Sequence, residues 1–306
     1  MNSWLKLTQG LLFSVLTAVS FASSAASASS SQDSRCHVTP ATTNTPEKTD
    51  CDIWSLTIQG STTGASGFPD KRDVLYSLPL GKVPKEGWPV VVFYQGSFFP
   101  TQFAGDHTTD SVDAYFGAYY ELQTIKELLD NGYAVLVPRA LNNIAWQTNV
   151  PNPMDPYGFY GFTITQDYKF LTNLLAAIND GQFDRHGKLN TNKLFATGIS
   201  SGGYNTSRMA VSFAGQFTAL AIHSASYATC NGSICSIPST MPKDHPPTVF
   251  LHGSKDPLVP VSTMERYYNT LQKNGITTEK HVFSGKGHEW VPQSPSIIRK
   301  WFDRHK

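Results

Sequence analysis

Two hydrophobic periods alternate along the chain. Residues 88–96 (WPVVVFYQG) and 133–140 (YAVLVPRA) are almost unbroken apolar runs, which predict strands buried on both faces of a sheet. Between them, residues 119–132 carry leucines and an isoleucine at helical spacing and end in a glycine, the pattern of an amphipathic helix with its stop. This part of the chain therefore predicts a strand, a helix and a second strand.

The same alternation continues to the end of the sequence. Further strands are predicted at 73–80, 193–200, 218–227, 246–253 and 278–285, and further helices at 167–180, 201–213, 262–275 and 296–305. Alternating strands and helices predict an α/β fold with a mostly parallel central sheet and helices on both faces, in a single domain. In such sheets the chemistry gathers at the carboxyl ends of the strands.

The amino-terminal part departs from this pattern. Residues 1–28 contain Lys6, a short apolar run and the small-residue stretch ASSAASA, the layout of a secretory signal peptide with Ala26 and Ala28 at the cleavage site. The apolar run is far shorter than the roughly 20 residues that span a bilayer. Residues 29–50, rich in Ser, Thr and Pro, predict an extended and mobile segment held mainly by Cys36. The catalytic domain is then expected over 51–306.

Composition narrows the function. The chain has 306 residues, 40% of them hydrophobic, with 15% charged residues and a formal net charge of +1. It shows no basic run, which argues against a nucleic-acid partner, and no second long apolar run, so no transmembrane segment is expected. It has neither an H-E-x-x-H motif nor a Cys/His cluster nor a phosphate-binding loop, so no metal and no cofactor are expected. Nothing in the pattern indicates an oligomeric state.

The four cysteines predict two disulfides. In an exported protein an even number of cysteines favours disulfide pairing, and three pairings of four cysteines are formally possible. The local pairs, Cys36 with Cys51 and Cys230 with Cys235, are favoured because they close short loops.

The stretch GISSGG at 198–203 holds the candidate nucleophile. The motif G-x-S-x-G marks the sharp strand-to-helix turn of the α/β-hydrolase fold, which is therefore the expected fold. This turn projects a serine from the sheet, and glycines on either side let the chain pass close to itself. Framed on Ser200, the flanking residues are Gly198 and Gly202; framed on Ser201, the residue two before is the branched Ile199. Because a strand is predicted before the motif and a helix after it, Ser200 is the expected nucleophile, against the alternative of a Gly/Ser turn without chemistry.

A serine of this kind needs a base and an acid, which follow it in the chain in the order Ser, acid, His. Asp256 lies a few residues after the predicted strand 246–253, whereas Asp244 precedes that strand and Asp303 lies in the terminal helix. Of the nine histidines, His288 lies in a Gly-rich loop directly after the last predicted strand. We therefore expect Asp256 as the acid, with a turn or helix-cap aspartate as its alternative role, and His288 as the base.

The oxyanion of the reaction needs two backbone N–H donors. One is expected from Ser201, the residue after the nucleophile, and the other from the loop YQGSFFP after the strand 88–96. In that loop Gly96 allows close approach of the backbone, and the N–H of Ser97 is the neighbouring donor. Removal of one such donor typically costs ~10² to 10³ in rate, and the sequence leaves the choice between Gly96 and Ser97 open.

Six stretches taken in order resemble a known family: YQGSFFP, YAVLVP, ATGISSGGYNTSRMAVSF, SYATC, DHPPTVFLHG and GKGHEW. They are similar to the secreted medium-chain-length polyhydroxyalkanoate depolymerases of bacteria, with similarity running from about Cys36 to the end of the chain. The resemblance implies hydrolysis of water-insoluble polyesters of 3-hydroxy acids by a serine mechanism, with nucleophile, acid and base at Ser200, Asp256 and His288. It also implies the two local cysteine pairs given above.

The sequence departs from related enzymes at two points. Gln95 stands where lipases carry the His of their HG oxyanion motif, and no linker and polymer-binding domain of the kind found in depolymerases of short-chain polyesters follows the predicted fold. Adsorption to polymer is then expected from the catalytic domain itself. The loop 142–163, rich in Pro, Gly and aromatic residues, is of a length that is usually functional. The candidate contacts, for which burial in the core is the alternative role, are Phe98, Phe99, Trp146, Tyr157, Phe159, Tyr160, Phe162 and Trp290.

These observations predict an extracellular serine ester hydrolase that acts on hydrophobic polyesters. The alternatives are a general secreted carboxylesterase, such as a feruloyl or acetyl xylan esterase, and a catalytically inactive binding module on the same fold. The series of intact triad candidates argues against the binding module.

Overall fold

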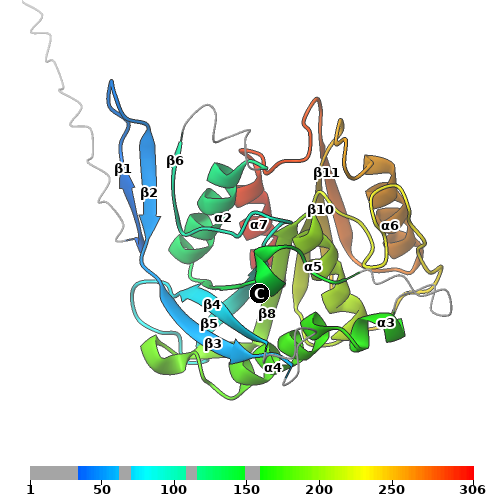
Figure 1. The fold of residues 1–306 in the computed structure, drawn as a ribbon, viewed down its shortest axis with the longest axis horizontal. Coiled ribbons are helices and arrows are strands. Elements are labelled where there is room, and N and C mark those ends of the chain that lie inside the picture. The colour runs from blue at the N-terminus through cyan, green and yellow to red at the C-terminus, as the bar shows by residue number, and fades with distance from the viewer. Residues whose placement is uncertain (1–33, 62–69, 108–115, 149–158) are drawn as a thin grey trace, which may run out of the picture. The chain divides into compact units, whose positions relative to one another are not determined.

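A mostly parallel sheet runs through the molecule (Figure 1). The structure, a computed structural model, describes residues 34–61, 70–107, 116–148 and 159–306. In these residues the large sheet has the strand order β11-β10-β9-β8-β5-β7-β4-β3. Its strands are β3 (Trp54–Gln59), β4 (Lys71–Ser77), β5 (Trp88–Tyr94), β7 (Ala134–Pro138), β8 (Leu189–Ile199), β9 (Ala219–His223), β10 (Thr248–Gly253) and β11 (Thr278–Phe283).

The six strands from β11 to β7 in this order are parallel, whereas β4 pairs antiparallel with β7 and β3 antiparallel with β4. The expected mostly parallel sheet is therefore confirmed. Strand β3 was not expected from the sequence. Its alternating exposed and half-buried residues (WSLTIQ) fit its position at the edge of the sheet.

Helices cover both faces of the sheet. Side chains of α2 (Ala118–Asp130) and α7 (Ser294–His305) pack in one hydrophobic cluster with Val91 and Phe93 of β5. Side chains of α4 (Gln166–Asn179) and α5 (Ser201–Ser212) pack in another with Val90, Val92 and Tyr94. Because successive residues of a strand point to opposite faces, the unbroken apolar run of β5 fills both layers. The helix α6 (Val261–Lys273) covers β9 and β10 beside α5.

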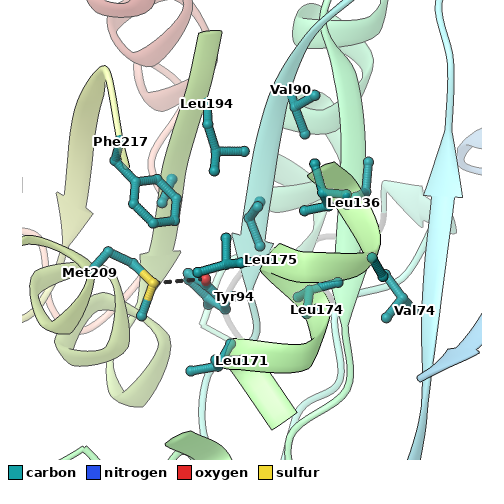
Figure 2. Packing of buried hydrophobic residues seen from close by; sticks show 14 of the residues in the cluster. Val74, Val90, Tyr94, Leu136, Leu171, Leu174, Leu175, Leu194, Met209 and Phe217 are labelled. Atoms are coloured by element: carbon teal, nitrogen blue, oxygen red, sulfur yellow. Dashed lines mark hydrogen bonds between the residues drawn. The ribbon is translucent and has the colours of Figure 1, made fainter. Parts of the chain in front are cut away.

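The layer between α4, α5 and the sheet is a close-packed core (Figure 2). Leu171, Leu174 and Leu175 of α4 pack there against the strands, as their helical spacing predicts. In the same layer the hydroxyl of Tyr94 donates a hydrogen bond to Sδ of Met209, 3.1 Å away. This contact joins the end of β5 to α5, the helix that begins at the candidate nucleophile.

A second, small sheet lies at the amino-terminal side. The strands β1 (Cys36–Thr39) and β2 (Glu47–Cys51) form an antiparallel hairpin, and β2 pairs with β6 (Ala104–His107). Residues 36–50 of the segment that was expected to be extended and mobile form this hairpin, which pairs with β6 and is closed by the Cys36–Cys51 disulfide. The Cys230–Cys235 disulfide forms as well, so both local pairings are confirmed.

Several sequence predictions fall outside the described residues. The expected signal peptide, residues 1–28, lies there, as does 149–158 of the loop 142–163. The described parts of that region are a 3₁₀ turn (Leu141–Asn143) and the short helix α3 (Phe159–Thr163); a second 3₁₀ turn covers Asp184–His186. Among the helices that the structure describes, none has the length and apolarity needed to cross a membrane.

Candidate active site

Ser200 occupies the turn between β8 and α5. Its backbone angles are φ 57° and ψ −122°, a conformation that non-glycine residues adopt only under constraint and that concentrates at functional sites. The turn is held on both sides, since the N–H of Ser200 donates to the carbonyl of His223 at 3.1 Å and its carbonyl accepts the N–H of Tyr204 at 2.9 Å. The strained backbone projects the Ser200 side chain at the carboxyl end of β8. The neighbouring Ser201 is already the first helical residue.

The glycines around Ser200 are required by close backbone approach. A Cβ atom on Gly202 would lie 2.1 Å from the carbonyl oxygen of Tyr94, and one on Gly198 would lie 2.5 Å from the same oxygen. A Cβ atom on Gly203 would lie 2.6 Å from the carbonyl oxygen of His223. The sequence argument for the first two glycines therefore has a steric basis at the end of β5, and Gly203 extends it to β9.

Asp256 lies in the turn after β10, with both carboxylate oxygens engaged. Oδ1 accepts the backbone N–H groups of Leu258 and Val259 at 2.9 and 2.8 Å, and Oδ2 lies 2.7 Å from Nδ1 of His288. Burial by itself raises the pKa of Asp256, but the hydrogen bonds from histidine side chains and from the Val259 N–H lower that pKa well below its usual value of 3.8. The Asp256 side chain is therefore a fixed carboxylate at neutral pH.

His288 lies in the loop between β11 and α7. Because the ionised carboxylate of Asp256 can only accept hydrogen bonds, the proton of the neutral imidazole resides on Nδ1, which leaves Nε2 as a base. Nε2 is buried and has no hydrogen-bond partner within the described part of the chain. The ring of Phe116 packs edge-on against the imidazole with centroids 5.0 Å apart. This arrangement presents a basic nitrogen with the tautomer that a serine nucleophile requires.

Three further contacts bring the His288 loop to the Ser200 turn. A Cβ atom on Gly96 would lie 3.3 Å from Ile199, which precedes Ser200, and 3.8 Å from Phe116, which packs on His288. The imidazole of His223, whose carbonyl holds the Ser200 N–H, lies with its centroid 4.6 Å from that of Trp290. The Ser200 turn, the His288 loop and the loop after β5 are thus linked through Ile199, Phe116 and Trp290.

Sequence reasoning missed His252. This fully buried histidine at the end of β10 has its Nε2 2.8 Å from the carbonyl oxygen of Val259 and 3.3 Å from Oδ2 of Asp256. Two acceptors at Nε2 fix the proton there, so His252 donates to the same carboxylate oxygen as His288. It precedes Asp256 by four residues, whereas the order Ser, acid, His points to a histidine after the acid.

His223 is a structural histidine. Its two ring nitrogens lie 3.1 Å from Oγ of Ser224 and 3.0 Å from Oγ of Ser294, and its side chain is fully buried. Burial, with the nearby imidazoles of His252 and His288, holds the pKa of His223 well below its usual value, so the ring is neutral. The neutral ring packs against Trp290 with both of its nitrogens engaged by serine hydroxyl groups.

The loop after β5 is pinned by Gln95. Its Oε1 accepts the N–H of Ala140 at 3.1 Å, and its carbonyl accepts Nε1 of Trp146 at 3.2 Å. The N–H of Phe98 donates to the carbonyl of Ile144 at 2.6 Å and is therefore not available to an oxyanion. Gln95 therefore anchors the loop to the chain after β7.

The aromatic candidates divide into exposed and buried residues. The side chain of Phe98 is 69% exposed, and Phe99 is half-buried beside Phe116. Trp146 is buried against Tyr94 and Phe170. It therefore has the alternative role considered above, burial in the core. Buried positions are also taken by Phe162 and Trp290. Tyr157 and the side chains of Phe159 and Tyr160 lie outside the described residues.

No group of three or more metal-binding side chains occurs among the residues that the structure describes. The site consists of a strained serine, a buried imidazole, a fixed carboxylate and backbone donors. Such a set activates an alcohol for attack on an acyl carbon.

The fold and this set of residues define the class of an α/β hydrolase of the carboxylesterase type. Residues 166–306 match the phospholipase/carboxylesterase family model. Among solved structures, an acylaminoacyl peptidase of Pyrococcus horikoshii superposes with a TM-score of 0.55 at 14% identity, over 83% of this chain and 41% of that one. An α/β hydrolase from a Medee basin deep-sea metagenome library superposes with a TM-score of 0.52 at 15% identity, over 82% of this chain and 97% of that one. These likenesses show the fold.

The sequence relationship is more specific. A poly(3-hydroxyoctanoate) depolymerase of Pseudomonas fluorescens is 46% identical over 272 residues, which are 89% of this chain and 91% of that protein. The chain belongs to the poly(3-hydroxyoctanoate) depolymerase family.

Proposed function

We propose that this protein is an extracellular serine hydrolase that cleaves the ester bonds of water-insoluble polyesters of medium-chain 3-hydroxy acids. The identity of 46% with a poly(3-hydroxyoctanoate) depolymerase over nearly the whole chain carries the proposal. The two disulfides and the signal-peptide pattern of residues 1–28 support export.

The reaction begins at Ser200. Its Oγ attacks the ester carbonyl carbon and passes its proton to Nε2 of His288, while Asp256 holds the imidazolium through Nδ1. The negative oxygen of the tetrahedral intermediate is bound by the N–H of Ser201 and by that of Gly96 or Ser97. The bond to the departing chain then breaks, and its alkoxide takes the proton from His288.

Water completes the cycle. It gives a proton to His288 as its oxygen bonds to the acyl carbon, the bond from that carbon to Oγ breaks, and Ser200 recovers its proton from His288. The products are the alcohol of the departing chain and a free carboxylic acid, and the hydroxyl group of Ser200 is regenerated. The proposed reaction needs neither a metal nor another cofactor.

Adsorption to the polymer is assigned to apolar side chains beside the oxyanion loop. Phe98 and Ile144 are 69% and 48% exposed and are joined by the backbone hydrogen bond between them. Exposed apolar neighbours of this kind favour contact with a hydrophobic surface. Phe98 holds its side chain out with a left-handed backbone, φ 65°.

The decisive test is the Ser200→Ala variant on suspensions of polyhydroxyoctanoate and polyhydroxybutyrate. Wild-type protein should clear the first far faster than the second, Ser200→Ala should clear neither, and Ser201→Ala, which keeps its backbone N–H, should stay active. Turnover of short soluble esters without clearing would support a general carboxylesterase instead. Clearing by Ser200→Ala, or wild-type protein that an organophosphate fails to label at Ser200, would overturn the mechanism.

A further inference from the structure

A cavity of about 380 Å³ lies directly beside the site. Its lining is mainly apolar and includes Gly96 of the oxyanion loop, Ile199 next to the nucleophile, and Phe116 and Trp290 around the base. Phe99 and Leu122 also contribute to the wall. A cavity that touches the neighbours of both reacting residues is placed to hold a group attached close to the scissile carbonyl.

The part of the lining that α2 contributes is held against the loop that carries His288. The N–H of Trp290 donates to the carbonyl of Phe116 at 2.7 Å. Gly117, which has φ 70° and precedes α2, approaches so closely that a Cβ atom there would lie 2.4 Å from the carbonyl oxygen of Trp290. The position of α2, which contributes Ala118 and Leu122 to the lining, is therefore fixed relative to His288.

Strand β6, which packs on α2 through Gly105 and Leu122, contributes Ala104 and Gly105 to the lining. It is backed by the amino-terminal hairpin, where Thr49 of β2 pairs with Gly105. The hairpin is also fastened to α2, since the hydroxyl of Tyr119 donates to Glu47 at 2.6 Å. Both elements that line the cavity on this side are thus anchored to neighbouring parts of the fold.

We propose that this cavity binds the alkyl side chain on C3 of the 3-hydroxyacyl unit whose carbonyl Ser200 attacks, and that α2 and β6 set the side-chain length the enzyme prefers. The inference rests on the proposed function. In a polyester of 3-hydroxy acids the side chain branches two carbons from the carbonyl, so a carbonyl held at Ser200 places the branch within reach of the wall formed by Gly96, Ile199 and Phe116. Although Gln102, Asp106, Tyr119 and Glu121 also line the cavity, most of its exposed lining is apolar, which matches an alkyl group, and the cavity exceeds what a methyl group would fill.

The test uses soluble 4-nitrophenyl esters of 3-hydroxybutanoate, 3-hydroxyhexanoate and 3-hydroxyoctanoate, whose side chains are methyl, propyl and pentyl. Each methylene that enters an apolar cavity is worth about four-fold in kcat/KM, so wild-type protein should prefer pentyl over methyl by up to about 200-fold. No rise in kcat/KM from methyl to pentyl would overturn the inference, while failure to hydrolyse any of these esters would instead refute the proposed function.

The Ala118→Leu variant fills the cavity from α2. It should lower kcat/KM for the pentyl ester at least about ten-fold, the equivalent of roughly two methylenes, and leave the methyl ester within about two-fold. Leu122→Ala, which enlarges the cavity, should shift the preference to longer side chains. The matched control is Ala176→Leu, the same change at an exposed position of α4, which should leave the whole series unchanged. An equal loss on all three esters in Ala118→Leu, or the same profile in variant and control, would refute the assignment.

Discussion

Replacing Asp256 by Asn tests the catalytic arrangement most directly, because it preserves the shape of the side chain, removes its charge and replaces one acceptor oxygen by a donor NH₂ group. In the wild-type protein one oxygen accepts two backbone N–H groups and the other accepts both histidines. In the Asp256→Asn variant the amide oxygen would keep the two backbone donors, which turns the NH₂ group of the new side chain toward His288. Nδ1 of His288 must then accept a hydrogen bond, so its proton moves to Nε2 and the base is lost.

The expected loss follows from that tautomer change. A serine hydrolase whose triad aspartate becomes asparagine loses about 10⁴ in kcat, or about 5 kcal/mol of transition-state stabilisation. The assay is the initial rate on 4-nitrophenyl butanoate from pH 5 to 9, with Asp244→Asn, an exposed aspartate before β10, as control. More than a tenth of wild-type activity in Asp256→Asn at any pH would refute the assignment of Asp256 as the triad acid.

The same variant has a stability signature. Because the pKa of Asp256 in the folded protein lies below its usual value of 3.8, the stability from its ionised form is present above about pH 4 and is lost as the pH falls through the folded pKa. Wild-type protein should therefore be more stable than Asp256→Asn at pH 7, by about 1.5–3 kcal/mol for a charge-assisted hydrogen bond, and the difference should shrink in acid. Urea unfolding at pH 7 and pH 3.5 measures both values.

Two further predictions concern packing and a buried carboxyl group. Gly202→Ala should lower the free energy of unfolding, measured in urea, by about 3 kcal/mol or more, because its Cβ would lie 2.1 Å from the carbonyl oxygen of Tyr94. Gly287→Ala, the control, has open space around the added atom and should be tolerated. Equal stability of the two variants would contradict this reasoning. Burial raises the pKa of Glu121 to about 7 despite its hydrogen bond from Thr101. The protonated carboxyl group therefore contributes to the free energy of unfolding below about pH 4.5, and this contribution is lost as the pH rises through about 7. Relative to Glu121→Gln, wild-type protein should lose at most about 3 kcal/mol between pH 5 and pH 8 in unfolding experiments, and parallel pH trends would contradict the assignment.

The central strands of the main sheet were predictable because they are buried on both faces. An unbroken apolar run such as that of β5 predicts a strand covered on both faces. The flanking segments with apolar residues at helical spacing predict the helices that cover it. The strands β1, β2 and β6 carry no such signal. Their sequences, CHVT, EKTDC and AGDH, are largely polar, and they are strands because of the pairing among them, in which β2 joins β6 from a distant part of the sequence.

The candidate site was predictable where its chemistry is tied to chain order. Ser200, Asp256 and His288 each follow a strand of a parallel sheet, and the carboxyl ends of such strands share one edge. His252 could not be found in this way. Four residues separate it from Asp256, a spacing that joins side chains on a helix but not on a strand, and only the turn after Gly253 brings the two together. The close approach of Gly253 to the carbonyl of Gly287, 2.1 Å from a Cβ position, fixes that turn against the His288 loop. The support of the triad acid therefore depends on contacts between β10 and the loop before α7, which no local pattern in either segment encodes.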